Sequence, residues 1–131
     1  MAAFVQRKGI TPETADLVVT DQHLTHMLRE TKVVAGKSVP EDMVRKMPEV
    51  LGKPDAVLWN KDKNNLTYVF DVPDDPRKGK FAVDVNFEFK YRPGGTGTKI
   101  TQQINAVKTG GMVQKDALTD TNVYEVIKGK P

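Results

Sequence analysis

A run of cationic side chains between Phe89 and Lys115 contains no acidic residue. Its members are Lys90, Arg92, Lys99, Lys108 and Lys115. The whole chain has a net charge of only +3, so this run is a local concentration of positive charge. A polyanion such as RNA is attracted to a positive field of this kind. The run therefore predicts a nucleic-acid contact surface, although a solvated outer sheet face carries a similar mixture of polar residues.

Two histidines, His23 and His26, lie three residues apart in a segment with helical character. Histidines at this spacing could supply two ligands to one metal ion. No third histidine and no nearby carboxylate pattern completes such a set, and the chain contains no cysteine. The sequence also lacks a phosphate-binding loop that leads into a helix and a dinucleotide fingerprint. We therefore expect neither a metal site nor a cofactor.

The helix that carries both histidines is predicted over residues 21–34, with Thr20 as its N-cap. Leu24 and Leu28 share the face of this helix that should be buried. The histidines share the opposite face with Arg29. We therefore expect the second histidine to lie on the surface of the protein.

After this first helix, the sequence predicts a second helix and then a series of strands. A second helix is predicted over residues 39–48, where Pro48 should end or kink it. The predicted strands cover residues 56–60, 66–72, 81–92 and 99–109. The shorter segments are residues 17–19 (strand or coil), 113–118 (helix) and 123–127 (a last strand or a cap on the core).

This order predicts an α+β fold, with N-terminal helices packed on an antiparallel sheet of about four strands. The strand over residues 81–92 alternates cleanly, so its aromatic side should face the helices. The predicted core comprises Leu24, Leu28, Val57, Phe70, Val83, Val85 and Phe87. The 131 residues should form a single domain, 1–131, with residues 1–16 as a loosely ordered N-terminal arm. No apolar run is long enough to cross a membrane, and the N-terminus lacks the apolar core of a signal peptide.

A succession of short motifs along residues 17–129 resembles a known family. The motifs are DQHLTHMLR (21–29) followed by Lys32, MPEVL (47–51), KPDAVLW (53–59), LTYVF (66–70), VDVN (83–86), INAVKT (104–109) and YEVI (124–127). This succession resembles the phage-encoded nuclease domains grouped with barnase, EndoU, the tRNase colicins and RelE (the BECR fold). Such domains are often attached to the C-terminus of phage Mu-like minor head proteins. The resemblance implies a BECR-like, barnase-like fold over residues 17–129.

The resemblance also implies a metal-independent endoribonuclease that needs no cofactor, because the 2′-hydroxyl of the RNA itself is the nucleophile. The protein must then supply a base for that proton and an acid for the leaving 5′-oxygen. It must also supply cations that stabilise the charge of the phosphorane-like transition state. RNA, with tRNA as one candidate, is the implied substrate.

The resemblance assigns this chemistry to seven residues. They are His26, Arg29 and Lys32 on the first helix, Asn105, Lys108 and Thr109 on the late strand, and Tyr124 near the end. The histidine would be the acid or base, the cations would hold the phosphate, and the tyrosine could donate a phenolic proton. Each has a structural alternative as well: a surface histidine, helix-face charges, an amide that holds a strand end, and a core tyrosine. His23 could replace His26, and the second proton carrier would be a lysine, a tyrosine or Glu88.

Two other functions are compatible with the same sequence. The domain could be a non-catalytic module for phage head assembly or DNA packaging, with a phage head protein or nucleic acid as its partner. It could also be a secreted toxin tail that requires an immunity protein. The expected location is the cytoplasm of a bacterial host or the phage particle.

Overall fold

The computed structural model describes residues 17–33, 39–73, 75–95 and 97–131, with backbone only for residues 30–33 and 93. The described residues form a six-stranded sheet with the order β1-β5-β4-β3-β2-β6. Its strands are β1 (Leu17–Val18), β2 (Ala56–Asn60), β3 (Asn65–Asp71), β4 (Lys78–Tyr91), β5 (Ile100–Val113) and β6 (Tyr124–Gly129). β1 pairs with β5 in parallel, and all other neighbours are antiparallel. The sheet is therefore mixed.

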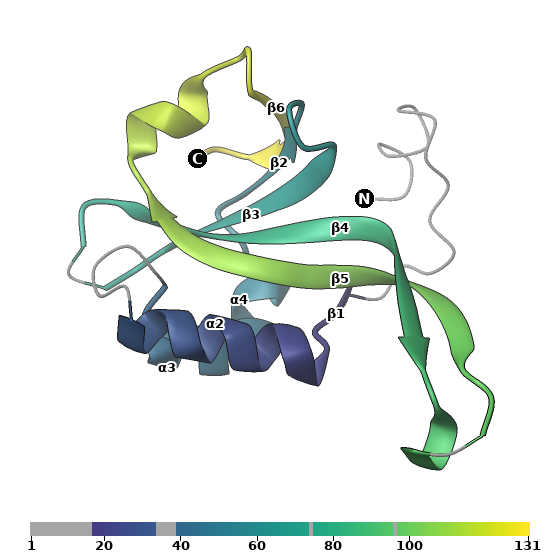
Figure 1. Cartoon of the computed structure of the whole chain (residues 1–131). Coiled ribbons are helices and arrows are strands. Elements are labelled where there is room, and N and C mark those ends of the chain that lie inside the picture. Colours follow the sequence, from purple (N-terminus) through teal and green to yellow (C-terminus); the bar gives the residue numbers. More distant parts are fainter. Residues whose placement is uncertain (1–16, 34–38, 74, 96) are drawn as a thin grey trace.

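Three α-helices lie together on one face of this sheet, and the segment before β6 lies on the other face (Figure 1). The helices are α2 (Asp21–Val33), α3 (Glu41–Arg45) and α4 (Met47–Gly52), and the 3₁₀ turns are η1 (Pro93–Gly95) and η2 (Lys115–Thr119). The N-cap prediction for α2 is confirmed, because the His23 amide donates to Thr20 Oγ1 at 3.2 Å. This bond satisfies one of the free N–H groups at the helix start.

The predicted second helix is divided into α3 and α4. The break lies at Lys46, whose φ of −90° and ψ of 15° depart from helical values. Pro48 does not end a helix but lies in the first turn of α4. Proline is tolerated there because the first N–H groups of a helix have no partner within the helix.

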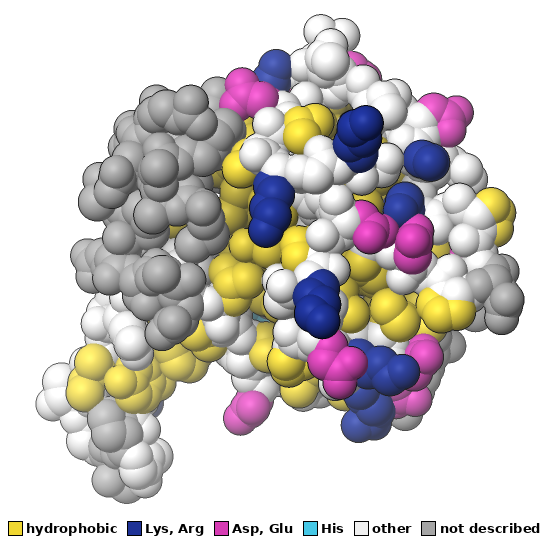
Figure 2. All heavy atoms as spheres, turned by 180° about the vertical axis from the view of Figure 1, so that it is seen from behind, with side chains coloured by type: hydrophobic (Ala, Val, Ile, Leu, Met, Phe, Trp, Pro, Cys, Tyr) yellow, Lys and Arg dark blue, Asp and Glu magenta, His cyan; other side chains and the backbone are white. Residues whose placement is uncertain are grey.

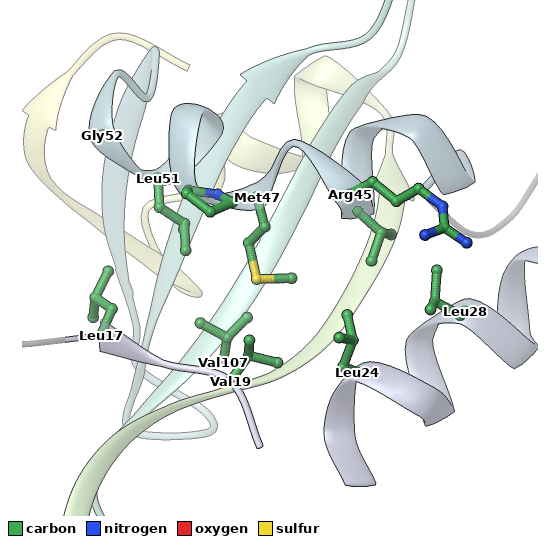
Figure 3. Close-up of a pocket in the computed structure, with 11 residues that line it drawn as sticks. Leu17, Val19, Leu24, Leu28, Arg45, Met47, Leu51, Gly52 and Val107 are labelled. Carbon is green, nitrogen blue, oxygen red and sulfur yellow. The ribbon is translucent and has the colours of Figure 1, made fainter. Parts of the chain in front are cut away.

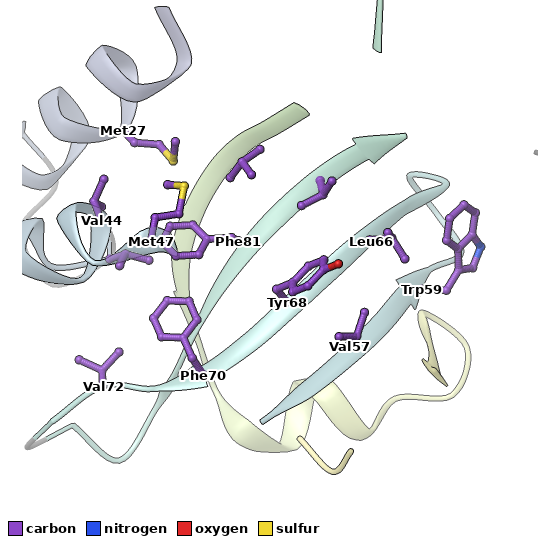
Figure 4. Packing of buried hydrophobic residues seen from close by; sticks show 13 residues of the cluster. Met27, Val44, Met47, Val57, Trp59, Leu66, Tyr68, Phe70, Val72 and Phe81 are labelled. Carbon is purple, nitrogen blue, oxygen red and sulfur yellow. The ribbon is translucent and has the colours of Figure 1, made fainter. Parts of the chain in front are cut away.

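The main core lies between the helices and the sheet. Met27, Val44 and Met47 come from the helices and point towards Phe70 and Phe81 of the sheet (Figure 4). The two phenylalanine rings stack with centroids 4.9 Å apart. A second cluster lies on the opposite face and contains Ala56, Leu58, Val69, Leu118 and Tyr124. β2 is therefore buried on both faces, and β3 is buried along all but its last residue.

The predicted fold class is wrong. The antiparallel sheet of about four strands, with its barnase-like arrangement, is replaced by a six-stranded mixed sheet in the described residues. The difference comes from both edges: Leu17–Val18 adds a parallel strand beside β5, and Tyr124–Gly129 adds an antiparallel strand beside β2. A two-residue strand is too short to show alternation, and a pairing between distant segments leaves no local pattern. The sequence therefore offered both segments as possible strands but could not indicate which strands they pair with.

Two irregularities interrupt the β4–β5 pairing and alter the predicted alternation. β5 has one extra residue, Lys108, opposite Ala82 and Val83, and β4 has one extra residue between Asp84 and Phe87. Asn86, inside the second bulge, has a φ of 57° in the left-handed region. Bulges bend a strand and interrupt its side-chain alternation. The predicted single inward face of β4 is therefore broken at residues 85–86.

The predicted core is correct in part. Val57, Phe70 and Val83 are buried in the main cluster, and Leu24, Leu28 and Val85 pack against it from its margin. Phe87 is only half-buried and lies outside the cluster. The predicted loose arm, residues 1–16, lies outside the described residues. None of the helices in the described ranges combines the length and apolar character needed to span a membrane.

Candidate functional site

Four side chains from α2, β4 and β5 meet beside the β4 bulge. The His23 ring contacts the Phe87 ring edge-on, with centroids 5.4 Å apart. Lys108 Nζ lies 5.1 Å from the centroid of the same Phe87 ring. Lys108 also forms an ion pair of 3.2 Å with Asp84. We call His23, Asp84, Phe87 and Lys108 the His23–Lys108 cluster.

The His23 imidazole has an altered protonation equilibrium. Its pKa is lowered from the ordinary value of 6.5, first by burial and then by the positive charge of Lys108, while Asp84 acts in the opposite direction. The Nδ1 atom of His23 is buried and finds no hydrogen-bond partner within the described part of the chain. A lowered pKa keeps the ring neutral at pH 7, and a neutral imidazole can accept a proton. His23 is therefore the described histidine best suited to act as a base.

Buried amides hold the strands around this cluster. Asn105 is fully buried, and its Oδ1 accepts a hydrogen bond of 3.3 Å from the backbone N–H of Asn86. This bond fixes the bulge whose extra residue separates Asp84 from Phe87. On the neighbouring strand, Asn65 Nδ2 donates to Asp84 Oδ1 at 3.2 Å. The carboxylate that pairs with Lys108 is thus itself oriented by a second, largely buried side chain.

The carboxylate and the ammonium also border a shallow hollow of about 270 Å³. Lys63, Asn65 and Thr109 complete its polar rim. Asn65 is only 7% exposed, and its Oδ1 has no hydrogen-bond partner among the described residues. The hollow therefore contains two cations (Lys63 and Lys108) and the Thr109 hydroxyl, which can hold an anionic ligand. It also contains the Asp84 carboxylate and the Asn65 amide oxygen, which cannot.

The residues predicted on the first helix lie apart from this hollow. His26 and Arg29 are exposed and border a separate pocket together with Asp21 and Thr25. Lys32 belongs to α2, but its side chain is outside the described part of the chain. The structure thus brings His23, and not His26, against Lys108. The assignment of His26 as the acid or base stays a prediction.

Of the residues predicted on the late strand, Lys108 is in the cluster, Asn105 supports it from the core and Thr109 is exposed at the hollow. Tyr124 is buried on β6, and this burial raises the pKa of its phenol. β6 is four strand spacings from β5, a distance of about 19 Å. The Lys63 ammonium, which borders the hollow, acts in the opposite direction on the pKa of Tyr124. The assignment of Tyr124 as a proton donor stays a prediction.

The predicted nucleic-acid-binding cations are spread over three regions. Lys90, Arg92 and Lys99 are exposed on the outer part of the β4–β5 hairpin, which projects from the body of the domain in Figure 1. Lys108 belongs to the cluster, and Lys115 is exposed at the start of η2. On the face drawn in Figure 2, basic and acidic side chains alternate over the body, and hydrophobic side chains gather on the projecting hairpin.

A second cavity lies between the helices and the β1–β5 edge. Its volume is about 610 Å³, and leucines from α2, α4 and β1 point into it together with Val107 (Figure 3). Among the described residues that border it, Arg45 alone is charged, and its guanidinium pairs with Glu41 at 3.2 Å. The lining contains no acid–base pair, so this cavity offers space for an apolar group but no groups for acid–base catalysis.

No three His, Cys, Asp or Glu side chains in the described ranges group closely enough to hold a metal ion. The sequence reasoning missed Asp84 as a partner of Lys108, and it treated Phe87 as core. The only available signal for Asp84 was an acid on the polar side of a strand next to the cationic run. The chain matches no family model, no curated protein and no solved structure.

Proposed function

We propose that this protein is a metal-independent endoribonuclease whose site is the His23–Lys108 cluster. One observation supports this proposal above the others: a histidine with a lowered pKa and a lysine contact the same phenylalanine ring from different elements. A base and a cation beside the same ring can act on one phosphodiester. The base would take the proton of the 2′-hydroxyl, and the cation would stabilise the phosphate.

The first step is removal of a proton from the 2′-hydroxyl by His23. Because Nδ1 is buried, Nε2 would accept this proton, in the neutral tautomer whose hydrogen is on Nδ1. The 2′-oxygen then attacks phosphorus, and the bond between phosphorus and the 5′-oxygen breaks. A base must be unprotonated at the working pH, and the lowered pKa of His23 keeps its ring neutral at pH 7.

The second role belongs to Lys108. Its ammonium is a point charge that stabilises the extra negative charge on the phosphoryl oxygens. It can also donate the proton that the leaving 5′-oxygen requires, which gives a 2′,3′-cyclic phosphate and a free 5′-hydroxyl. Asp84, at 3.2 Å from Lys108 and hydrogen-bonded by Asn65, orients the ammonium. Asp84 is therefore a positioning residue in this proposal.

The decisive experiment compares two histidine variants of the purified protein on bulk tRNA in EDTA. His23→Gln should lower the cleavage rate by about 10²–10⁴-fold, the typical contribution of one proton-transfer group. His26→Gln, on the same helix and with the same change of side chain, is the matched control and should cause a much smaller loss. The product should carry a 2′,3′-cyclic phosphate.

Three results would contradict the proposal in different ways. A larger loss in His26→Gln than in His23→Gln would favour the histidine predicted from the sequence. A requirement for added divalent metal would exclude the mechanism. Saturable RNA binding without any cleavage by the wild-type protein would favour the non-catalytic nucleic-acid-binding module. Circular dichroism of each variant establishes that it is folded before rates are compared.

A further inference from the structure

The outer part of the β4–β5 hairpin has a partly exposed aromatic face that belongs to neither core cluster. Phe89 and Tyr91 stack with centroids 5.4 Å apart and an angle of 16° between their planes. Their cross-strand partners are Gln102 and Ile100, and Ile100 is 44% exposed. The rings are only partly buried. We define Phe89, Tyr91, Ile100 and Gln102 as the arm face.

We propose that the arm face binds single-stranded RNA by stacking bases on Phe89 and Tyr91. That the ligand is RNA rests on the proposed function. The new claim is that the RNA is bound as a single strand. Aromatic side chains beside cations are the usual platform for unpaired bases, because every base has a ring face that can stack. The bases of a duplex are already stacked and paired, so they cannot reach such a platform.

The position of the arm face relative to the His23–Lys108 cluster supports this assignment. Phe87, Phe89 and Tyr91 follow one another at every second position of β4, and the pairing with β5 is regular over this stretch. Two residues of a strand advance about 7 Å. The arm face therefore begins at about 7 Å from Phe87 and continues away from the cluster. A single RNA strand could thus contact both the cluster and the arm face.

The charges along the hairpin favour a polyanion over a protein partner. Lys108 lies at the inner end, where its Nζ is over the Phe87 ring. At the outer end, Arg92 and Lys99 directly follow and precede the Tyr91–Ile100 pair, and both are exposed. Glu88 and Lys90 alternate with the aromatic residues, so they belong to the opposite face of the hairpin. Arg92 continues this alternation, and its Nε donates to the Gly97 carbonyl at 3.1 Å in the turn. Cations therefore lie near both ends of the aromatic track, at Lys108 and at the turn.

The test measures binding of an RNA that the protein cannot cleave. A 2′-O-methyl oligonucleotide of twelve nucleotides is labelled for fluorescence anisotropy, alone and annealed to its complement. The double variant Phe89→Ser, Tyr91→Ser should weaken binding of the single strand by about five- to a hundredfold for each stacked base, and affect the duplex little. Val126→Ser is the matched control, because Val126 is 53% exposed on β6 at the far edge of the sheet.

A second variant separates stacking from a general disturbance of the hairpin. Tyr91→Phe keeps the aromatic ring and should keep the affinity for the single strand. The dependence of affinity on salt should stay the same in the double variant, since it reports cation–phosphate contacts and not stacking. Equal weakening of single strand and duplex, or no weakening at all, would overturn the proposal. So would a change of oligomeric state in the double variant, which would identify the arm face as a contact with a second copy.

The outcome also distinguishes this inference from the proposed function. Ring-dependent binding of the single strand in a protein that cleaves no RNA would leave the arm proposal in place and remove the catalytic one. Cleavage that requires His23, combined with binding that ignores both rings, would do the reverse.

Discussion

The inner and outer halves of the β4–β5 hairpin have similar alternating sequences and different surroundings. In the inner half, Phe81 and Val83 are fully buried in the main core. In the outer half, Phe89 and Tyr91 stack on each other and are only partly buried, and Ile100 is 44% exposed. Alternation with a period of two shows which side chains share a face, but not what covers that face. An apolar strand face is therefore core only where another element packs on it.

The largest expected effect is on the free energy of unfolding, which should fall much more for a substitution in the inner half than for one in the outer half. Phe81→Ala should lower the free energy of unfolding by about 3–5 kcal/mol, because it leaves a cavity in the core. Phe89→Ala should change it by less than about 0.5 kcal/mol, as is usual for substitutions away from the core. Urea denaturation of both variants measures the difference. Equal losses would show that the outer half is packed as tightly as the inner half.

A substitution at a glycine in the inner half should also lower the free energy of unfolding, by less than Phe81→Ala does. A Cβ atom added at Gly79 would approach the ring of Phe70, which itself stacks on Phe81. Gly79→Ala should therefore destabilise the protein by about 1–3 kcal/mol. Gly52→Ala is the control, because its Cβ would meet nothing within 4 Å and its φ is outside the left-handed region. A stable Gly79→Ala variant in thermal melting would contradict the close approach.

The smallest expected effect concerns His23, which lies against Phe87 between the two halves. The folded pKa of His23 is lowered, so below about pH 6.5 the unfolded chain binds a proton that the folded chain binds less readily. Stability from this residue is complete above pH 6.5 and falls as the pH decreases through that value. Urea midpoints at pH 7.5 and 5.5 should show this decline in the wild type and less of it in His23→Gln. The His26→Gln variant should keep most of the decline, because it retains His23.

Much of the local structure could be predicted from the sequence. Thr20 and the apolar spacing of Leu24 and Leu28 identified α2, and the runs around Trp59 and Phe70 identified β2 and β3. These elements have caps, turns and periodicity that act within a few residues. The sheet order could not be predicted, because the pairing of Val57 with Lys128 in β6 depends on packing and not on any local signal.

The candidate site could be predicted only in part, for a related reason. Lys108 and Asn105 were identified from a motif, and the structure places both beside the bulge. Alternation extended through residues 81–92 assigned Phe87 to the core, because an extra residue in a strand has no composition of its own. The contact between His23 and Phe87 depends on that extra residue. The sequence alone therefore favoured His26, which has Arg29 on its face of the helix, over His23.

The sheet order has a consequence for the time course of folding. Strands β4 and β5 are joined by a short turn, with Tyr91 paired to Ile100 only nine positions later. β2 and β6 pair residues 64 to 73 positions apart, and β1 and β5 pair Leu17 with Asn105, 88 positions apart. Contacts between distant segments form slowly, because a long loop must close first. We expect pulse-labelled hydrogen exchange to protect the hairpin amides early and those of β6 and β1 last, so that the two edges of the sheet are its last parts to leave the solvent.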